Sequence, residues 1–182
     1  MREILPLHKI IVITLFLCCF ALGNDTGWLN IESLKANFRQ EIKGERGATP
    51  AIYQGRFYAK ENKVKWEYIM PLKKEVYLEK DTAFVYEPNL KQVTIGKLKE
   101  NVDFIHILKM VKKNTKGEYE ATIADTKYTL IAKDSKPYLL SYKDNLDNEI
   151  SITFTDVEIN PVIDSQVFLL QPPDDVEYID AH

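Results

Sequence analysis

The chain has 182 residues, of which 45% are hydrophobic and 28% are charged, and its formal net charge is −3. This composition is that of one ordinary folded domain and argues against a disordered or low-complexity chain. Lysine and arginine are scattered among acidic residues and form no basic stripe, which argues against a nucleic-acid partner.

Residues 1–23 have the layout of a secretory signal peptide. A basic start precedes an uninterrupted apolar run at residues 10–20, which is too short to cross a bilayer as a helix. Ala21 and Gly23 then place small residues where a cleavage site needs them. We therefore expect an exported, soluble mature domain over residues 24–182; the alternative is an uncleaved anchor.

Both cysteines, Cys18 and Cys19, lie inside this signal segment. The bulky Phe16 and Leu17 before Cys18 are unlike the small residues that precede a lipid-modified cysteine. Cleavage would leave a mature chain without disulfides, which must be held together by its core alone.

Two patterns overlap at the start of the mature chain. Asp25 or Thr26 can cap a short helix that includes Trp28. Beyond it, Ile31, Leu34, Phe38 and Ile42 fit a helical stripe, whereas every second residue from Leu34 to Ile42 also fits one face of a strand. We expect a short helix that turns into a strand near Ser33. A turn and a second strand follow, at residues 44–50 and 52–60.

The stretch from Lys63 to Pro88 predicts three short antiparallel strands. In the first of them Val64, Trp66 and Tyr68 fall on one side of a two-residue alternation, with charged residues on the other side. Two further strands are expected at residues 75–79 and 83–86. Such a meander has one apolar, aromatic face, which must be covered either by protein or by a ligand.

The second half of the chain predicts further strands and one more helix. Residues 91–98 alternate as a strand, residues 101–110 form a short apolar helix, and residues 112–117 form a solvated turn. The remaining strands are expected at residues 119–124, 128–133, 138–142 and 150–154, the last extended by residues 157–162. About ten strands with two short helices predict one mainly β domain, a curled antiparallel sheet partly closed into a barrel.

The mature chain carries few groups for catalysis or metal binding. It has no cysteine and only two histidines, His106 and His182, which excludes a Cys–His pair and a zinc cluster. It lacks the phosphate-binding loop of nucleotide hydrolases, and its acidic turn at residues 144–149 lacks the ligand spacing of a calcium loop. We therefore expect no enzyme activity, no cofactor and no metal site.

Aromatic residues are the more informative feature. Ten tyrosines, eight phenylalanines and two tryptophans lie mostly in the predicted strands. On composition alone, these side chains fit a filled barrel core and the wall of a cavity for an apolar ligand equally well. If they form a cavity, the short helices near Trp28 and at residues 104–108 would be its lid.

Four short motifs occur in order along the chain. They are Phe38-Arg39-Gln40, VKWEYIMP at residues 64–71, FVYEPNLKQV at residues 84–93 and FLLQPPDDVEYID at residues 168–180. Together they resemble the motifs F-x-Q, W-x-[YM]-x-x-P, Y-[DN]-P-x-x-x-Q and P-P-x-G-V of the LolA family, the periplasmic outer-membrane lipoprotein carriers, with Glu87 and Asp175 at the [DN] and G positions. The region between residues 101 and 160 agrees with that family only in its pattern of elements.

This resemblance implies an unclosed antiparallel barrel covered by a lid of helices. Its hydrophobic cavity would accept the acyl chains of lipoproteins released by an inner-membrane ABC-type transporter. The protein, a monomer in the periplasm, would pass this cargo to an outer-membrane acceptor. On the same resemblance, the residues of the cavity wall and lid are Trp28, Phe38, Val64, Trp66, Tyr68, Phe84, Tyr86, Phe104, Ile105 and Leu108.

One position departs from the family pattern. In the family, an arginine followed by proline after the second strand bonds to the lid helices and holds the empty form closed. That position falls here on Lys60, which is followed by Glu61. Lysine has three donors on a flexible stem where arginine has a rigid fork of five. Either Lys60 is a looser gate for the lid, or another residue closes it.

Two other functions stay open from the sequence. The first is a related half-barrel protein that binds or senses a lipid without transferring a lipoprotein. The second is an interaction module in which the aromatic face is simply core. Bound acyl cargo on the purified protein would distinguish a cavity from a core.

Overall fold

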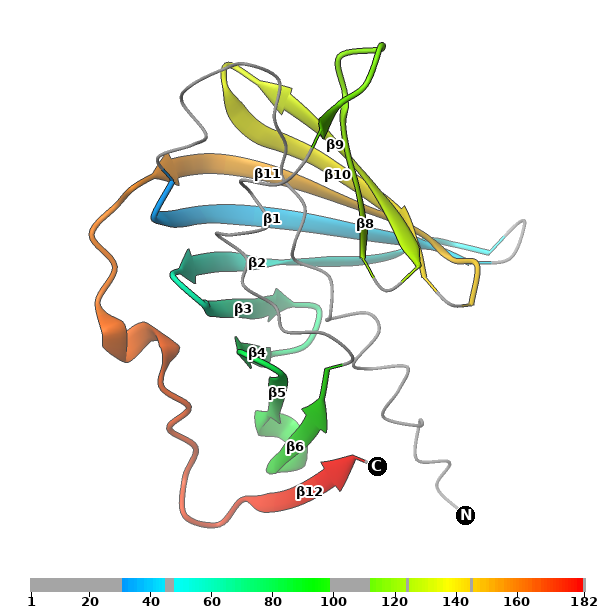
Figure 1. Ribbon diagram of the computed structural model, residues 1–182. Helices are drawn as coiled ribbons and strands as arrows, with labels where there is room; N and C mark the ends of the chain where they lie inside the picture. Colours follow the sequence, from blue (N-terminus) through cyan, green and yellow to red (C-terminus); the bar gives the residue numbers. More distant parts are fainter. Residues whose placement is uncertain (1–30, 45–47, 99–111, 124, 145, 182) are drawn as a thin grey trace.

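A single curled sheet makes up most of the described chain (Figure 1). The computed structural model describes residues 31–44, 48–98, 112–123, 125–144 and 146–181. Within them, twelve strands run in the order β12-β6-β5-β4-β3-β2-β1-β11-β10-β9-β8-β7, and the two end strands are not paired with each other. The sheet is an unclosed, mainly antiparallel barrel, which confirms the predicted fold class.

Most strands lie where the alternation predicts them, with small shifts at their ends. Two short 3₁₀ turns, η1 (Pro88–Leu90) and η2 (Ser165–Phe168), accompany them. The strands are β1 (Ser33–Lys43), β2 (Ala51–Lys60), β3 (Lys63–Met70), β4 (Lys74–Glu79), β5 (Thr82–Glu87), β6 (Gln92–Lys97), β7 (Lys112–Lys113), β8 (Tyr119–Ile123), β9 (Thr126–Lys133), β10 (Lys136–Lys143), β11 (Glu149–Ile159) and β12 (Glu177–Ala181).

Strand β1 is central because it pairs with β2 on one side and with β11 on the other. Along it Leu34, Ala36, Phe38 and Gln40 are buried, and the residues between them are more exposed. A period of two places these residues on one face only if the segment is a strand. The predicted change to a strand near Ser33 is therefore confirmed.

The predicted meander is formed by β3, β4 and β5. Val64, Trp66 and Tyr68 of β3 are buried, as their alternation predicts. The register places Val76 of β4 opposite Trp66, and Val85 of β5 opposite Val76. Cross-strand partners share a face of a sheet, so these residues form one row across the buried face.

One strand pair departs from the antiparallel pattern. After β11 the chain runs along one side of the sheet, orange to red in Figure 1, and β12 pairs in parallel with β6. The N–H of Glu177 donates to the carbonyl of Lys91 at 2.9 Å, and Lys91 Nζ contacts the Asp175 carboxylate. These contacts fasten the start of β12 to the strand it joins.

At the edge of the sheet opposite β12, the structure has a strand, β7, that the sequence does not predict. The sequence predicts a solvated turn over residues 112–117, whereas Lys112 and Lys113 form β7 and pair with β8. Both lysine side chains are exposed, so this segment has no alternation of apolar and polar residues from which a strand could be predicted. The backbone pairing follows the edge of β8 and is accompanied by one side-chain contact, in which Lys113 Nζ lies 5.3 Å from the Tyr119 ring centroid.

The two predicted lid helices fall almost entirely outside the described residues. Trp28, Phe104, Ile105 and Leu108 all lie outside them. The described part of the chain contains no α-helix, and no helix there has the length and apolar content needed to cross a bilayer.

Candidate functional site

The inner face of the curled sheet, defined here as the face that carries Trp66, is almost continuously apolar. Its buried side chains form one contiguous cluster that extends from β5 across β1 to β8. The cluster includes Leu34, Ala36, Phe38, Phe57, Val64, Trp66, Tyr68, Val76, Leu78, Ala83, Val85, Tyr119, Tyr128, Leu130, Leu140, Tyr142, Ile150, Ile152 and Phe154.

Aromatic rings gather around Trp66 in the middle of this face. The Phe38 ring lies 4.7 Å from the Trp66 ring, edge to face at 86°, and the Phe57 ring lies 4.8 Å away. The Phe154 ring, from β11, is also within 6.2 Å of Trp66. Because β11 and β3 are separated by two strands, this contact requires long side chains that lean across the sheet.

The absence of a side chain at Gly55 makes space for the Phe38 ring. It stands opposite Phe38 in the β1–β2 register. A Cβ atom at Gly55 would come within 2.9 Å of Phe38 Cε1 and 1.9 Å of the Glu67 carbonyl oxygen. Only glycine therefore allows the Phe38 ring to lie against the backbone of β2 and reach Trp66.

Two tyrosines show how strongly this face is withdrawn from water. Burial raises the pKa of Tyr68 well above its usual value. Burial also raises the pKa of Tyr142, and the nearby Tyr68 adds to that shift. Tyr68 belongs to β3 and Tyr142 to β10, several strands away in the sheet, so the curl brings them near each other. Both hydroxyls are neutral at physiological pH.

Two buried polar groups on the inner face have no hydrogen-bond partner among the described residues. The Gln40 side chain is fully buried, and neither its Oε1 nor its Nε2 is paired. The same holds for Nε1 of Trp66, whose side chain is 1% exposed. A buried polar group left without a partner costs about 1–3 kcal/mol. Gln40 is not among the site residues predicted from the sequence, although the alternation of β1 places it beside Phe38.

The structure brings together four of the sequence-predicted wall residues and separates two others from them. Phe38, Val64, Trp66 and Tyr68 all lie buried on the inner face. Phe84 and Tyr86 do not share that wall, because the register pairs them with Tyr77 and Glu75 on the outer face. The smaller Ala83 and Val85 point inward in their place.

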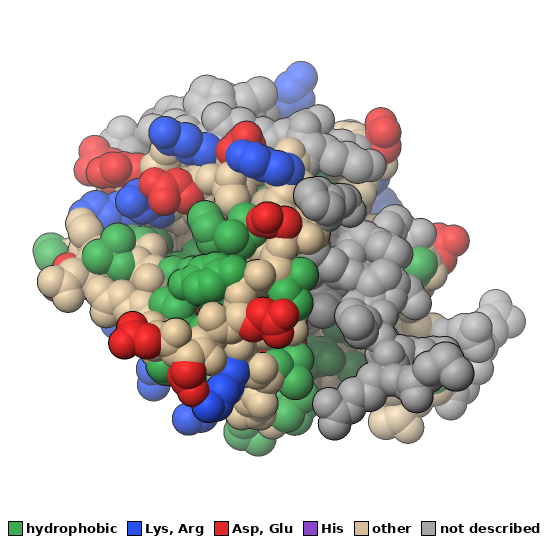
Figure 2. Space-filling view, turned by 90° about the horizontal axis from the view of Figure 1, so that it is seen from below, with side chains coloured by type: hydrophobic (Ala, Val, Ile, Leu, Met, Phe, Trp, Pro, Cys, Tyr) green, Lys and Arg blue, Asp and Glu red, His purple; other side chains and the backbone are tan. Residues whose placement is uncertain are grey.

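The outer face carries a smaller apolar group of its own. Phe84 and Tyr77 line a groove of about 170 Å³ together with Phe168 and Leu169 from the segment after β11. Figure 2 shows the molecule from below, where hydrophobic side chains gather on the described part of the surface and charged side chains lie above, to the left of and below them. Val64 and Leu78 of the inner cluster also line this groove, so it lies at the border of the inner face, where the crossing segment packs against the sheet.

The chain resembles known lipoprotein carriers over most of its length. Residues 29–138 match the family described as outer membrane lipoprotein carrier protein LolA. A Helicobacter pylori outer-membrane lipoprotein carrier protein is 44% identical over 147 residues, which cover 80% of this chain and 78% of the relative. The Helicobacter hepaticus protein of the same name is 34% identical over 182 residues and 98% of its length. The chain belongs to the LolA family.

A solved structure agrees with the fold of this LolA family member. The crystal structure of an uncharacterized conserved protein from Thermus thermophilus covers 84% of this chain and 92% of its own, with a TM-score of 0.50. Sequence identity is 10%, so the likeness shows the fold alone.

Lys60, the predicted gate of this LolA family member, contacts the segment that follows β11. Its Nζ donates to the carbonyl oxygen of Ile163 at 3.3 Å. Ser33 Oγ donates to the Pro161 carbonyl at 2.8 Å, beside the same contact. Lys60 therefore ties the β2–β3 end of the sheet to the crossing segment. The predicted lid contacts of Lys60 lie outside the described residues.

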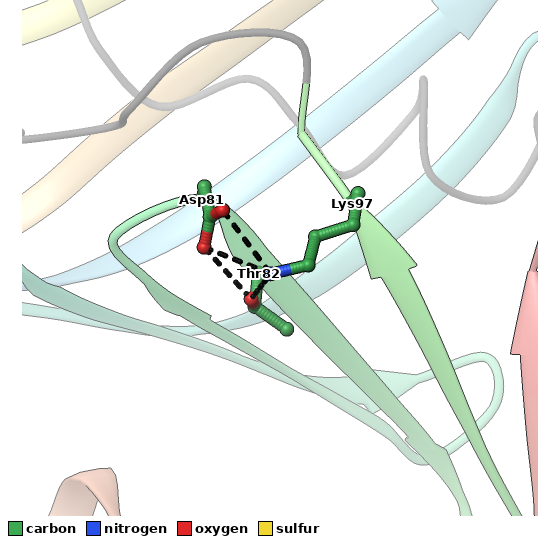
Figure 3. Close-up of polar contacts among 3 residues, drawn as sticks. All are labelled: Asp81, Thr82 and Lys97. Carbon is green, nitrogen blue, oxygen red and sulfur yellow. Dashed lines mark hydrogen bonds and ion pairs between the residues drawn. The ribbon is translucent and has the colours of Figure 1, made fainter.

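Polar contacts made by Lys97 hold the end of β6. Lys97 Nζ donates to both carboxylate oxygens of Asp81 at 3.1 Å and to Thr82 Oγ1 at 3.0 Å (Figure 3). The Lys97 ammonium is the main cause that lowers the pKa of Asp81. All three groups are on the surface, and within the described residues no three or more His, Cys, Asp or Glu side chains are grouped to hold a metal ion.

Proposed function

We propose that this protein is a periplasmic carrier that binds the acyl chains of lipoproteins and delivers them to the outer membrane. The observation that carries the proposal is the continuous apolar inner face, which spans the sheet from β5 to β8 around Trp66. The relatives in the same family are named as outer-membrane lipoprotein carriers, which supports the same function.

Such a carrier must shield a large hydrophobic surface of its cargo from water. Each methylene group that leaves water gains about 0.8 kcal/mol, so an acyl chain needs an extended apolar surface to cover it. The inner face offers aromatic rings and branched aliphatic side chains over many strands. The end strands of the described sheet do not join, so its width is not fixed by barrel closure.

The proposal also assigns a route and partners. The chain would be exported by its signal segment at residues 1–23 and act as a monomer without enzymatic activity. An inner-membrane ABC-type transporter would supply the acylated lipoprotein, and an outer-membrane acceptor would receive it. The family resemblance supports these partners, and Lys60 would control how firmly the lid is held.

Transfer from membranes tests this function directly. Inner-membrane vesicles that carry a labelled lipoprotein are incubated with ATP and the purified protein. We expect the labelled lipoprotein to appear in the soluble fraction in a complex with the protein, and only when ATP is present. The Helicobacter pylori relative serves as the positive control. Release by the relative without any release by this protein would contradict the proposal.

A further inference from the structure

We propose that Gln40 and the Trp66 indole N–H form a polar subsite within the inner face that binds the carbonyl group of an ester- or amide-linked acyl chain. This inference rests on the proposed function and goes further, because it assigns the part of the ligand that joins the hydrocarbon to the protein cargo. The apolar face would hold the chains, and these two residues would fix how far the chains enter.

The first support is the unpaired state of these groups among the described residues. Gln40 is fully buried in β1 with an unpaired donor and an unpaired acceptor, and the Trp66 donor is unpaired in β3. Buried polar side chains in folded proteins are nearly always hydrogen-bonded. An apolar side chain of similar size at position 40 would avoid this loss, so fold stability alone does not account for a glutamine there.

The second support is position. Gln40 lies two residues from Phe38 on the same face of β1, and the Trp66 ring packs against Phe38. Both residues are therefore neighbours of Phe38, Gln40 along β1 and Trp66 across the sheet. The nearest cross-strand partners of Gln40 are Tyr53 and Ile152, so its amide lies among mainly apolar side chains. A few placed polar groups in an apolar surface are typical of ligand sites that fix orientation.

The chemistry of the ligand follows from the donors. Trp66 Nε1 only donates, and the Gln40 amide both donates and accepts. An ester carbonyl accepts hydrogen bonds and matches Trp66 Nε1 and Gln40 Nε2. An amide-linked chain offers a carbonyl and an N–H, and its N–H can donate to Gln40 Oε1. A hydrocarbon or ether chain lacks the carbonyl acceptor and would leave these groups without a good partner.

The test compares two ligands that differ only in the carbonyl groups. One is a synthetic lipopeptide with two ester-linked palmitoyl chains, and the other is its dialkyl ether analogue. We expect the full-length protein to bind the ester form about three- to tenfold more tightly. Gln40→Met should bring the two affinities close together without lowering the melting temperature. Gln54→Met, on the exposed face of the neighbouring strand, should keep the preference.

The indole N–H gives a second measurement. In the Trp28→Phe variant, Trp66 is the remaining tryptophan, so its Nε1–H resonance is assigned directly by NMR. We expect this resonance to move downfield with the ester lipopeptide and to move less with the ether analogue. Equal shifts with the two ligands would show that the indole N–H is not part of the subsite.

The outcomes separate this inference from the function on which it rests. Binding of both lipopeptides with equal affinity would overturn the polar subsite and leave acyl-chain binding intact. An ester preference that persists in Gln40→Met would remove Gln40 from the subsite. A large drop in melting temperature for Gln40→Met would show that its amide is satisfied within the fold, and would also overturn the inference. Binding of neither ligand would contradict the proposed function itself.

Discussion

At the scale of single residues, the inner face depends on how closely side chains approach the backbone. Phe38 reaches Trp66 only because Gly55, its neighbour on β2, has no side chain. Gln40, two residues along β1, is equally buried but polar. One glycine therefore permits the aromatic packing, while one glutamine places an unpaired amide within a mainly apolar surface.

Gly55→Ala tests this close approach. The added methyl group would overlap the Glu67 carbonyl and press on the Phe38 ring, so β2 and β3 would have to move apart. We expect a loss of about 1–3 kcal/mol in the free energy of unfolding, measured with urea. Gly44→Ala is the matched control, because its nearest neighbour is the flexible side-chain end of Asn148 at 3.3 Å. Equal effects of the two variants would contradict the argument.

At the scale of elements, strand phase decides which side chains face inward. In β5 the small Ala83 and Val85 are buried in the inner cluster, while the larger Phe84 and Tyr86 lie on the outer face. The aromatic residues of this strand are the natural candidates from sequence. The pairing of β5 with β4 fixes the opposite phase, since a shift of one residue would turn every side chain over.

Single cysteines on β5 measure that phase. A chain that begins at Asn24 contains no cysteine, so each introduced thiol reports one position. We expect the thiol of Val85→Cys to react with a maleimide about 100-fold more slowly than that of Tyr86→Cys, because a buried thiol reacts only after local opening. Faster reaction of Val85→Cys would reverse the assigned faces. Circular dichroism of both variants controls for folding.

The attachment of β12 to β6 gives an element-scale prediction about pH. The Lys91 ammonium lowers the pKa of Asp175 below its usual range. A carboxylate with a lowered folded-state pKa stabilises the fold at pH values above the ordinary aspartate pKa of about 3.9, and this contribution is lost as the pH falls through the lowered value. NMR titration should show a lowered Asp175 pKa that rises again in Lys91→Met. The same pKa in both proteins would exclude this pairing in solution.

Much of this element-scale arrangement could be predicted from the sequence, for identifiable reasons. The alternation in β1 and β3 is strict, so it predicts which side chains are buried there, and Phe38, Val64, Trp66 and Tyr68 are buried in one cluster. Alternation alone does not identify the partner of a strand. The sequence therefore gives no sign of the parallel pairing of β12, and it wrongly places Phe84 and Tyr86 on the inner wall. The importance of Gln40 depends on the hydrogen bonds that its buried amide lacks, which no sequence pattern predicts.

At the scale of the whole molecule, the crossing segment after β11 joins the two halves of the sheet. It leaves β11 near β1, is bonded by Lys60 at Ile163, and ends in β12 beside β6 (Figure 1). A change in the curl of the sheet would therefore also move this segment. Lys60, predicted as a gate for the lid, lies at the start of that connection.

Lys60→Leu tests the role of this connection in cargo release. The substitution removes the hydrogen bond to Ile163, so we expect bound lipoprotein to leave about threefold faster while the sheet stays folded. Lys63→Leu is the control, since Lys63 lies on the same hairpin and pairs with Glu79 instead. Release is measured by transfer of labelled lipoprotein to outer-membrane vesicles. Unchanged receipt and release in Lys60→Leu would remove this residue from the gate.

The unclosed sheet has a consequence for how the protein behaves in a crowded compartment. An open sheet has two free edges, and a free edge can recruit strands from other chains and start aggregation. Here β7 is only two residues long and both are lysines, while β12 carries Glu177 and Asp180. A short, positively charged edge is a poor template for foreign strands, and the two carboxylates of β12 oppose pairing beside its exposed Tyr178 and Ile179. The barrel can thus stay open without becoming a seed for polymers of its own chain.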